Sequence, residues 1–273
     1  MCLMLFAWHA RPDYPLIFAG NRDEAYVRPS LAAAFWEDEP EIFGGRDLEK
    51  GGSWLALTRS GRLATVTNYR AGFSRSGEAP RSRGGLVASY LRSTEPPTRY
   101  LQHVIPSSAQ YRDFCLIVGD LEHLYFYSNR GSGPEEIAPG VHGLSNHLLD
   151  TPWPKVRQGR ERVSALLQCS ENEMVAGLFE ILADRTRAPD TELPDTGVGL
   201  TRERELSSCF IADQHYGTRA STVLLINSDG HVLFIERLFG PLGVAQGSTE
   251  HRFKLDAGAT VNVGAAATLR ERT

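Results

Sequence analysis

Short apolar and polar blocks alternate along the chain, a pattern typical of a protein rich in β-strands. Residues 3–8 form an unbroken apolar run, residues 11–15 hold two prolines and an aspartate, and residues 16–19 are apolar again. Two apolar runs on either side of such a turn predict a β-hairpin. In a hairpin centred near residue 13, paired positions add up to about 26, so Cys2 is expected to pair near Glu24, within two residues.

Similar apolar runs bounded by turn residues predict the other strands. They are expected at residues 33–36, 54–58, 62–67, 114–118, 124–127, 208–212, 222–226 and 232–236. Apart from its possible strand, the stretch 28–41 is expected to be irregular. The glycine-rich stretches 44–47 and 51–53 are expected to form loops with tight turns. They do not match a phosphate-binding loop, because no Gly-Lys-Ser/Thr follows them.

Helical periodicity is confined to the middle of the chain. Helices are expected at residues 86–91, 98–105, 151–168 and 172–184, and the polar, Pro- and Gly-rich stretch 185–205 is expected to be a long loop. With strands at both ends and helices between them, the pattern predicts an α+β layered sandwich of two antiparallel sheets with helices outside. Neither a repeat nor a linker interrupts residues 1–255, which are expected to form a single domain, and residues 256–273 a weakly ordered tail.

Composition narrows the possible partners and compartments. Hydrophobic residues make up 41% and charged residues 23% of the 273 residues, which is ordinary for a soluble globular protein. A net charge of −4 gives no electrostatic footprint for nucleic acid. No stretch approaches the roughly 20 apolar residues of a membrane span, and the N-terminus does not resemble a signal peptide. We therefore expect a cytoplasmic protein without a membrane span or a nucleic-acid partner; the oligomeric state stays open.

The four cysteines are far apart and form no CxxC motif, so neither a disulfide framework nor a metal site is expected. Cys115, Cys169 and Cys209 lie in or beside apolar stretches and are expected to be small buried hydrophobes. Cys2 differs because it follows an initiator Met that is normally removed before so small a residue. The amine exposed in this way titrates near ~8 and can serve as general base for the adjacent thiol. The plain alternative is a second-position cysteine without a role.

The predicted hairpin brings residues 21–24, with the sequence Asn-Arg-Asp-Glu, beside Cys2. A cationic neighbour such as Arg22 lowers the pKa of a thiol, and Asp23 or Glu24 could orient the amine or the arginine. Because adjacent strand residues face opposite sides, Asn21 and Asp23 share one face and Arg22 and Glu24 the other. Which of the two acidic residues faces Cys2 stays open at this point.

A second polar group follows the predicted strand at residues 62–67. Asn68, Tyr69 and Arg70 come directly after this strand. An asparagine in this place is most often a turn former. Its amide also supplies two N–H groups, which suit it to stabilise an oxyanion.

Several of these blocks together resemble a known family. The chain is similar to the NRDE family, which includes the eukaryotic transport and Golgi organisation proteins, over about residues 1–240. The blocks that carry the resemblance are Cys2 and residues 21–24, 44–47, 67–70, 144–146, 150–156 and 216–219. The resemblance implies the four-layer αββα sandwich of the N-terminal nucleophile hydrolases, with penicillin V acylases and bile salt hydrolases as the nearest enzymatic relatives.

The resemblance also implies roles for individual residues. Cys2 would be the nucleophile and, through its amine, the base; Arg22 would tune the thiolate and Asp23 would hold the amine. The oxyanion would lie near Asn68 and Asn146. The remaining implied site residues are Arg219, which would close the site, and Asn21, Glu24, Tyr69 and Arg70, which would contact the substrate. No cofactor is implied.

Three functions are compatible with the sequence. The first is an amidohydrolase that cleaves a non-peptide C–N bond in a small-molecule substrate through a thioester on Cys2. The second is a carrier that keeps the fold without the chemistry and binds a hydrophobic ligand such as haem or an acyl-CoA or lipid. The third is a zinc hydrolase, which lacks an HExxH motif. His142 and His147, five residues apart, are expected to be ordinary surface or core residues.

Overall fold

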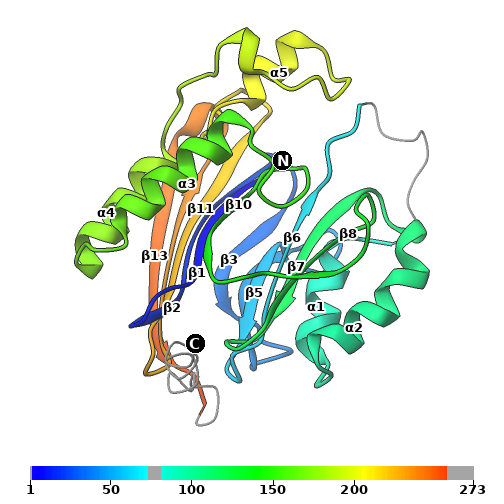
Figure 1. Ribbon diagram of the computed structural model, residues 1–273, viewed down its shortest axis with the longest axis vertical. Helices are drawn as coiled ribbons and strands as arrows, with labels where there is room; N and C mark the ends of the chain where they lie inside the picture. The colour runs from blue at the N-terminus through cyan, green and yellow to red at the C-terminus, as the bar shows by residue number, and fades with distance from the viewer. Residues whose placement is uncertain (1, 73–80, 257–273) are drawn as a thin grey trace, which may run out of the picture.

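Two antiparallel sheets stacked face to face form the centre of the computed structural model, which describes residues 2–72 and 81–256 (Figure 1). The first sheet contains, in spatial order, β10 (Gly140–Leu144), β1 (Cys2–Arg11), β2 (Tyr14–Ala25), β11 (Tyr216–Ile226), β12 (His231–Phe239) and β13 (Ala245–Lys254). The second contains β3 (Ser30–Phe35), β4 (Ile42–Asp47), β5 (Leu55–Thr58), β6 (Leu63–Asn68), β7 (Phe114–Gly119), β8 (Leu124–Ser128) and β9 (Glu135–Glu136).

The first hairpin, β1 and β2, lies in the middle of the first sheet and confirms the predicted one. Cys2 pairs with Arg22, and the ladder continues to Trp8 opposite Leu16. The register thus falls at the edge of the predicted window around Glu24. Alternate residues of β1 pack against the second sheet or against the outer helices, so both faces are buried. This double burial explains why its sequence is a continuous apolar run.

Helices cover the outer face of each sheet (Figure 1). On the first sheet lie α3 (Pro154–Leu166) and α4 (Glu171–Leu182), and on the second lie α1 (Gly84–Arg92) and α2 (Pro97–Val104). Proline at the first helical position begins α3, and a capping box formed by Ser170 and Glu173 begins α4. The predicted sandwich of two antiparallel sheets with helices outside is confirmed. None of the helices in the described chain is long and apolar enough to cross a membrane.

The glycine-rich stretch 44–47, predicted as a loop, is part of β4. Gly44 has a φ of +157°, and a Cβ atom at this position would lie 2.5 Å from the carbonyl oxygen of Leu55 and 2.6 Å from the Cβ of Ala56. The glycine therefore permits close approach of β4 and β5 within a sheet. The loop prediction was wrong because glycine is favoured both in tight turns and where two strands approach closely.

Three further differences between the predicted and the observed elements lie toward the C-terminal end of the chain. Residues 208–212 form no strand; one isolated bridge, Ala212 to Gly217, is present there. The stretch 185–205 contains a 3-10 turn (Asp190–Glu192) and most of α5 (Leu200–Leu206). Strand β13 was not predicted, because its outward positions are polar and exposed, as suits a sheet edge. All but the first residue of the predicted tail, 256–273, lies outside the described residues.

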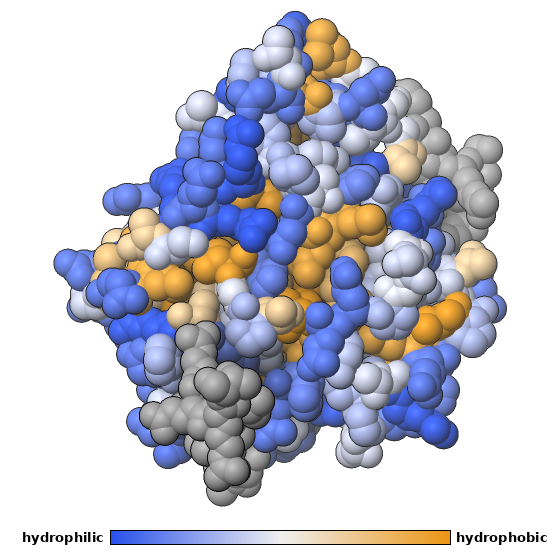
Figure 2. Space-filling model, in the orientation of Figure 1, coloured by the Kyte–Doolittle hydropathy of each residue, from blue (hydrophilic) through white to orange (hydrophobic). Residues whose placement is uncertain are grey.

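Apolar side chains fill three layers: between the sheets, and between each sheet and its helices. The middle layer holds large side chains such as Trp8, Phe43 and Phe234. In Figure 2, apolar residues gather in the middle of this face, with hydrophilic residues around them. Because the sheets are held apart by this layer, polar groups placed between them have few hydrogen-bond partners.

Glu236 on β12 is such a polar group. It is completely buried and faces the second sheet, where its Oε2 accepts a hydrogen bond of 2.8 Å from the backbone N–H of Ala33. Its Oε1 has no hydrogen-bond partner among the described residues. Burial raises the pKa of Glu236 to about 7, although the N–H of Ala33 and the charge of Arg22 oppose the rise.

The raised pKa makes stability depend on pH. The unfolded chain ionises this carboxyl near its usual pKa of 4.5, whereas the folded chain holds the proton up to about pH 7. Its stabilising contribution is complete below pH 4.5 and is lost as the pH rises through 7. We expect Glu236→Gln to gain on the order of 3 kcal/mol of unfolding free energy relative to wild type between pH 4.5 and 7.5, measured by urea unfolding. A constant difference across this range would contradict the assignment.

Candidate active site around Cys2

A cleft with two adjoining lobes lies at the end of the sandwich where β1 begins and which α5 overhangs (Figure 1). The proximal lobe, about 300 Å³, is lined by Cys2, Arg22 and Trp54 among others. The distal lobe, about 290 Å³, lies on the side of Tyr69 and Arg202. Both lobes share the residues Asn68, Arg83 and Tyr216 as part of their lining.

The backbone of Cys2 is held on both sides by the two residues that follow β10. Its N–H donates to Oδ1 of Asn146 at 3.3 Å, and the hydroxyl of Ser145 donates to its carbonyl oxygen at 3.2 Å. Strand β10 pairs with β1, with Leu144 opposite Met4, so Ser145 and Asn146 leave the sheet beside the chain start. Asn146 has a φ of +59°, a left-handed conformation that asparagine tolerates better than most residues.

The amide nitrogen of Asn146 connects this site to the second sheet. Nδ2 donates to Thr67 Oγ1 at 2.7 Å and, at 3.0 Å each, to the side-chain and backbone oxygens of Asn68. Since the Asn68 Oδ1 is an acceptor here, its Nδ2 is left as a donor, and it makes no hydrogen bond to the described residues. Asn68 lines both lobes. The amide of Asn146 is thus fully occupied by hydrogen bonds to other residues, whereas the amide N–H groups of Asn68 are left to donate to a ligand.

Arg22 lies directly opposite Cys2 in the β1–β2 ladder and therefore on the same face of the sheet. Its guanidinium carbon is 4.2 Å from the centre of the Trp54 ring, and Nη1 donates to Ser30 Oγ at 3.4 Å. The residue is buried and lines the same lobe as Cys2. The aromatic face of Trp54 fixes a positive charge beside the thiol without neutralising it.

Asp23 points to the opposite face of the strand, where it is buried. Its Oδ1 accepts a 2.7 Å hydrogen bond from the hydroxyl of Thr218. Burial raises its pKa, while Lys155, Thr218 and Arg70 act to lower it. Lys155, which sequence reasoning missed, is fully buried, and burial, with the charge of Arg70, lowers its pKa to about 8. Arg22 and Asp23 thus lie on different faces of β2.

Two of the predicted substrate contacts are held by the fold. The side-chain N–H groups of Asn21 donate to the carbonyl oxygens of Leu182 and Cys209, and its Oδ1 accepts from Ser221. Arg70 forms a buried 2.6 Å ion pair with Glu203 of α5. Asn21 lines neither lobe, so the geometry does not support its assignment to substrate contact, whereas Arg70 lines the distal lobe. Without tertiary contacts, the sequence could not distinguish a buried polar anchor from a binding residue.

Glu24 and Arg219 lie at the entrance side of the site. Glu24 lines the proximal lobe, and its Oε1 accepts from the N–H of Ala25 at 2.9 Å. Arg219 sits at a bulge in β11 and donates to the backbone oxygen of Arg28, in the turn between β2 and β3. Arg219 therefore braces the rim and does not contact the lobe that contains Cys2.

Tyr69 and His147 form a side wall near the distal lobe. The hydroxyl of Tyr69 bonds to Nε2 of His147 at 2.7 Å, and Nδ1 of that ring bonds to Thr151. His142 bonds separately to Asp150. Within the described residues, no three His, Cys, Asp or Glu side chains gather as a group of metal ligands.

The other cysteines differ from Cys2 in environment. Burial raises the pKa of Cys115 to about 12 and that of Cys209 to about 11. Cys115 also donates to the backbone oxygen of His147 at 3.0 Å. Cys2 and Cys169 are half-buried. Of these two, Cys2 opens on the cleft.

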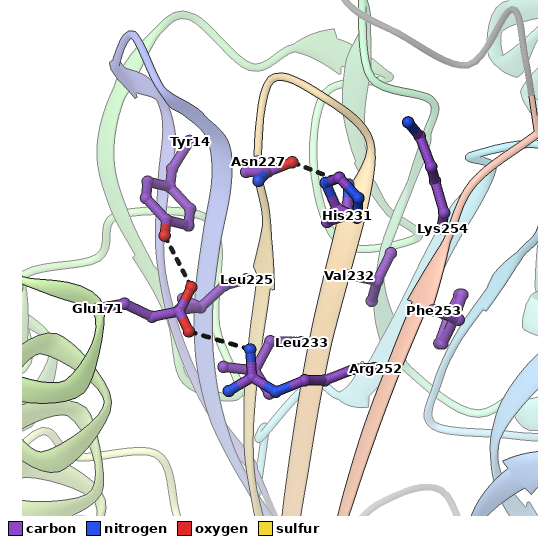
Figure 3. A pocket seen from close by; sticks show the side chains of 10 residues that line it. All are labelled: Tyr14, Glu171, Leu225, Asn227, His231, Val232, Leu233, Arg252, Phe253 and Lys254. Atoms are coloured by element: carbon purple, nitrogen blue, oxygen red, sulfur yellow. Dashed lines mark hydrogen bonds and ion pairs between the residues drawn. The ribbon is translucent and has the colours of Figure 1, made fainter.

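A larger cavity, about 400 Å³, lies at the other end of the first sheet, where Tyr14 begins β2 (Figure 3). The polar groups on its walls bind one another: Tyr14 donates to Glu171 at 2.8 Å, and Arg252 donates to the same carboxylate at 3.2 Å. Asn227 accepts from the backbone of His231. Tyr14, Glu171 and Arg252 are thus engaged with one another, whereas the polar groups around Cys2 include the unused amide donors of Asn68.

The fold and the site define an αββα sandwich protein with a cysteine-centred cleft at the end of its two sheets. The chain belongs to the Transport and Golgi organisation 2 family, whose model matches residues 1–241. It is 37% identical to the Transport and Golgi organization protein 2 homolog of Bos taurus, covering 94% of this chain and all of that one. It is 35% identical to the Homo sapiens homolog, covering 87% of this chain and 92% of the human protein.

Two solved structures are similar over most of the chain. One is a conjugated bile acid hydrolase from Clostridium perfringens, with a TM-score of 0.47 and 7% identity, covering 93% of this chain and 92% of that chain. The other is a penicillin V acylase from Agrobacterium tumefaciens, with a TM-score of 0.46 and 11% identity, covering 85% and 82%.

The ion pair between Arg70 and Glu203 fixes α5 over the cleft, and its energetics can be tested directly. Both side chains are at most 4% exposed. Removing one partner of a buried pair leaves an uncompensated charge, so Arg70→Met is expected to cost about 3–5 kcal/mol of unfolding free energy. The double variant R70M/E203M should lose less than R70M alone, measured by chemical denaturation. If the double variant were as unstable as R70M, the loss would come from the missing ion pair and not from an uncompensated charge on Glu203.

Proposed function

We propose that the protein is an N-terminal-cysteine amidohydrolase that cleaves a non-peptide C–N bond through a thioester on Cys2. The observation that carries the proposal is the hydrogen bond from the Cys2 N–H to Asn146, within a network that leaves the amide of Asn68 as a donor beside the thiol. One asparagine holds the group that becomes the base once Met1 is removed. The other offers N–H groups to the developing oxyanion.

The chemistry follows in two stages. The neutral amine of Cys2 takes the proton of the thiol, and the thiolate attacks the carbonyl carbon of the amide. The oxyanion accepts hydrogen bonds from Asn68 Nδ2, and the ammonium returns its proton to the leaving nitrogen as the C–N bond breaks. Water, activated by the same amine, then hydrolyses the thioester, which releases the acid and restores the thiol.

The two neighbours of Cys2 on β2 act on different groups in this proposal. Arg22 shares the face of the thiol and stabilises the thiolate. Asp23 follows Arg22 on β2, and Arg22 is paired with Cys2, the first residue of β1. Asp23 is therefore level with the amine that removal of Met1 would expose, and it is suited to hold that amine. The thiol and the amine leave Cys2 in different directions, so adjacent strand residues can serve both.

The geometry favours this function over a carrier of haem or an acyl group. Such a ligand needs an apolar cavity of several hundred Å³. The apolar space beside Cys2, lined by Leu3, Met4 and Phe18 among others, holds about 10 Å³. That is roughly the room one water molecule needs. The two lobes of the cleft are larger but carry charged walls.

Mass spectrometry and a thiol probe test the proposal together. The intact mass should lack Met1, and an acylating probe should label Cys2 in preference to Cys115, Cys169 and Cys209. In a screen of acyl amides, any hydrolysis should disappear in Cys2→Ala while the melting temperature stays close to that of wild type. Retention of Met1, or activity that survives in Cys2→Ala, would contradict the proposal.

Asn68 gives a second, quantitative test. If its amide stabilises the oxyanion, Asn68→Ala should lower the rate of thioester formation by about 10²–10³-fold, the cost of losing one oxyanion donor. Labelling of the Cys2 thiol by an alkylating probe, which forms no oxyanion, should change little, because Asn68 lies outside the backbone contacts of Cys2. A rate within a factor of about three of wild type, by single-turnover acylation, would assign the oxyanion to another donor.

A further inference from the structure

Arg83 stands at the junction of the two lobes and was not singled out by any sequence pattern. It lines both the proximal lobe, which contains Cys2, and the distal lobe. Its one hydrogen bond in the described chain is from Nη1 to the backbone oxygen of Asp113, at 3.2 Å. Among residues 2–72 and 81–256, no carboxylate lies within 4 Å of its guanidinium, since Arg83 takes part in none of their ion pairs.

Two of the three other arginines that line the distal lobe differ from Arg83, because each has a carboxylate partner. Arg70 is paired with Glu203, and Arg202 is paired with Glu205 at 2.7 Å. The single acidic residue of the lobe, Asp113, is itself held by Arg130 at 2.8 Å. Four arginines and one acidic residue line the distal lobe, so it is positively charged, and Arg83 is the arginine that it shares with the lobe containing Cys2.

The surroundings of Arg83 also make its positive charge costly. Burial lowers its pKa, and the nearby charges of Arg112 and Arg28 act in the same direction, whereas Cys2 and Glu24 act against it. The N-terminus of α1, which begins one residue later, opens on the same lobe and has no acidic residue in its first turn. An anion placed here would compensate a partly desolvated cation.

We propose that Arg83 and the distal lobe bind a carboxylate on the substrate, a few bonds from the C–N bond that is cleaved. The inference rests on the proposed function and narrows its substrate class to acyl amides whose amine part is an acid, such as N-acyl amino acids. Arg83 would orient the amide so that its carbonyl lies between Cys2 and Asn68. The flat, two-pronged guanidinium suits a carboxylate, which a lysine would match less well.

The test compares two probes that differ only in charge, N-acetylglycine and N-acetylglycinamide, whose short acyl group needs no apolar cavity. Binding is measured by calorimetry on the otherwise intact Cys2→Ala protein, in which turnover is absent. The carboxylate probe should bind roughly 10- to 100-fold more tightly than the amide probe, because hydrogen bonds to charged groups are the stronger kind. Arg83→Met in the same background should remove this preference, and Arg83→Lys should keep part of it.

Arg81→Met serves as the matched control, since Arg81 is exposed and lies two residues away. It should leave the preference unchanged. Equal affinities for the two probes, no measurable binding of the carboxylate probe, or a preference that survives Arg83→Met would each overturn the proposal. Because binding is read without turnover, the result is separate from the hydrolase test. Loss of catalysis in Cys2→Ala with no preference for the carboxylate would refute this inference and leave the proposed function standing.

Discussion

The amide of Asn146 is the one interaction on which the rest of the site depends. Its oxygen accepts the N–H of Cys2 from the first sheet, and its nitrogen donates to Thr67 and Asn68 at the end of β6 in the second. The residue is completely buried and left-handed, so its position is set by the surrounding backbone. Because one side chain bridges both sheets, the distance between the chain start and Asn68 is fixed by the packing of the sandwich.

The apolar layer between the sheets fixes this distance and leaves little room for polar groups. Large aromatic side chains separate the sheets, so each buried polar group there needs a specific partner. Near Cys2 the partners are arranged in a network that includes Asn146, Thr67 and Ser145. Deeper in the layer, Glu236 has one partner and a raised pKa. The polar groups near Cys2 are thus better supplied with hydrogen-bond partners than Glu236 is.

Much of the fold could be predicted from the sequence because it depends on local pattern. The hairpin of β1 and β2 followed from two apolar runs and a turn, and its register followed from counting, which brought Arg22 beside Cys2. The failures came where one local pattern serves two structures. Glycines in β4 were taken for a loop, and the polar edge strand β13 was overlooked, since exposure on one face hides a strand's periodicity.

The site was predictable only in part, for a similar reason. Motif resemblance and the hairpin register predicted Cys2, Arg22 and Asn68 as site residues, and the first two lie opposite each other. Asn21 looked equally suited to a substrate, yet its amide is consumed by contacts with distant segments. Arg83 went unnoticed because its significance lies in having no carboxylate partner in the described part of the chain, which no local pattern reveals.

The central claim is that the α-amine of Cys2, freed by removal of Met1 and held by Asn146, is the base that activates its own thiol. Its most direct test is the pH dependence of thioester formation on Cys2, compared with a chain extended by a Gly-Ser dipeptide in front of Cys2. The account predicts a rate that rises with a pKa near ~8 in the processed chain and no acylation in the extended one. Equal rates in the two chains would contradict it.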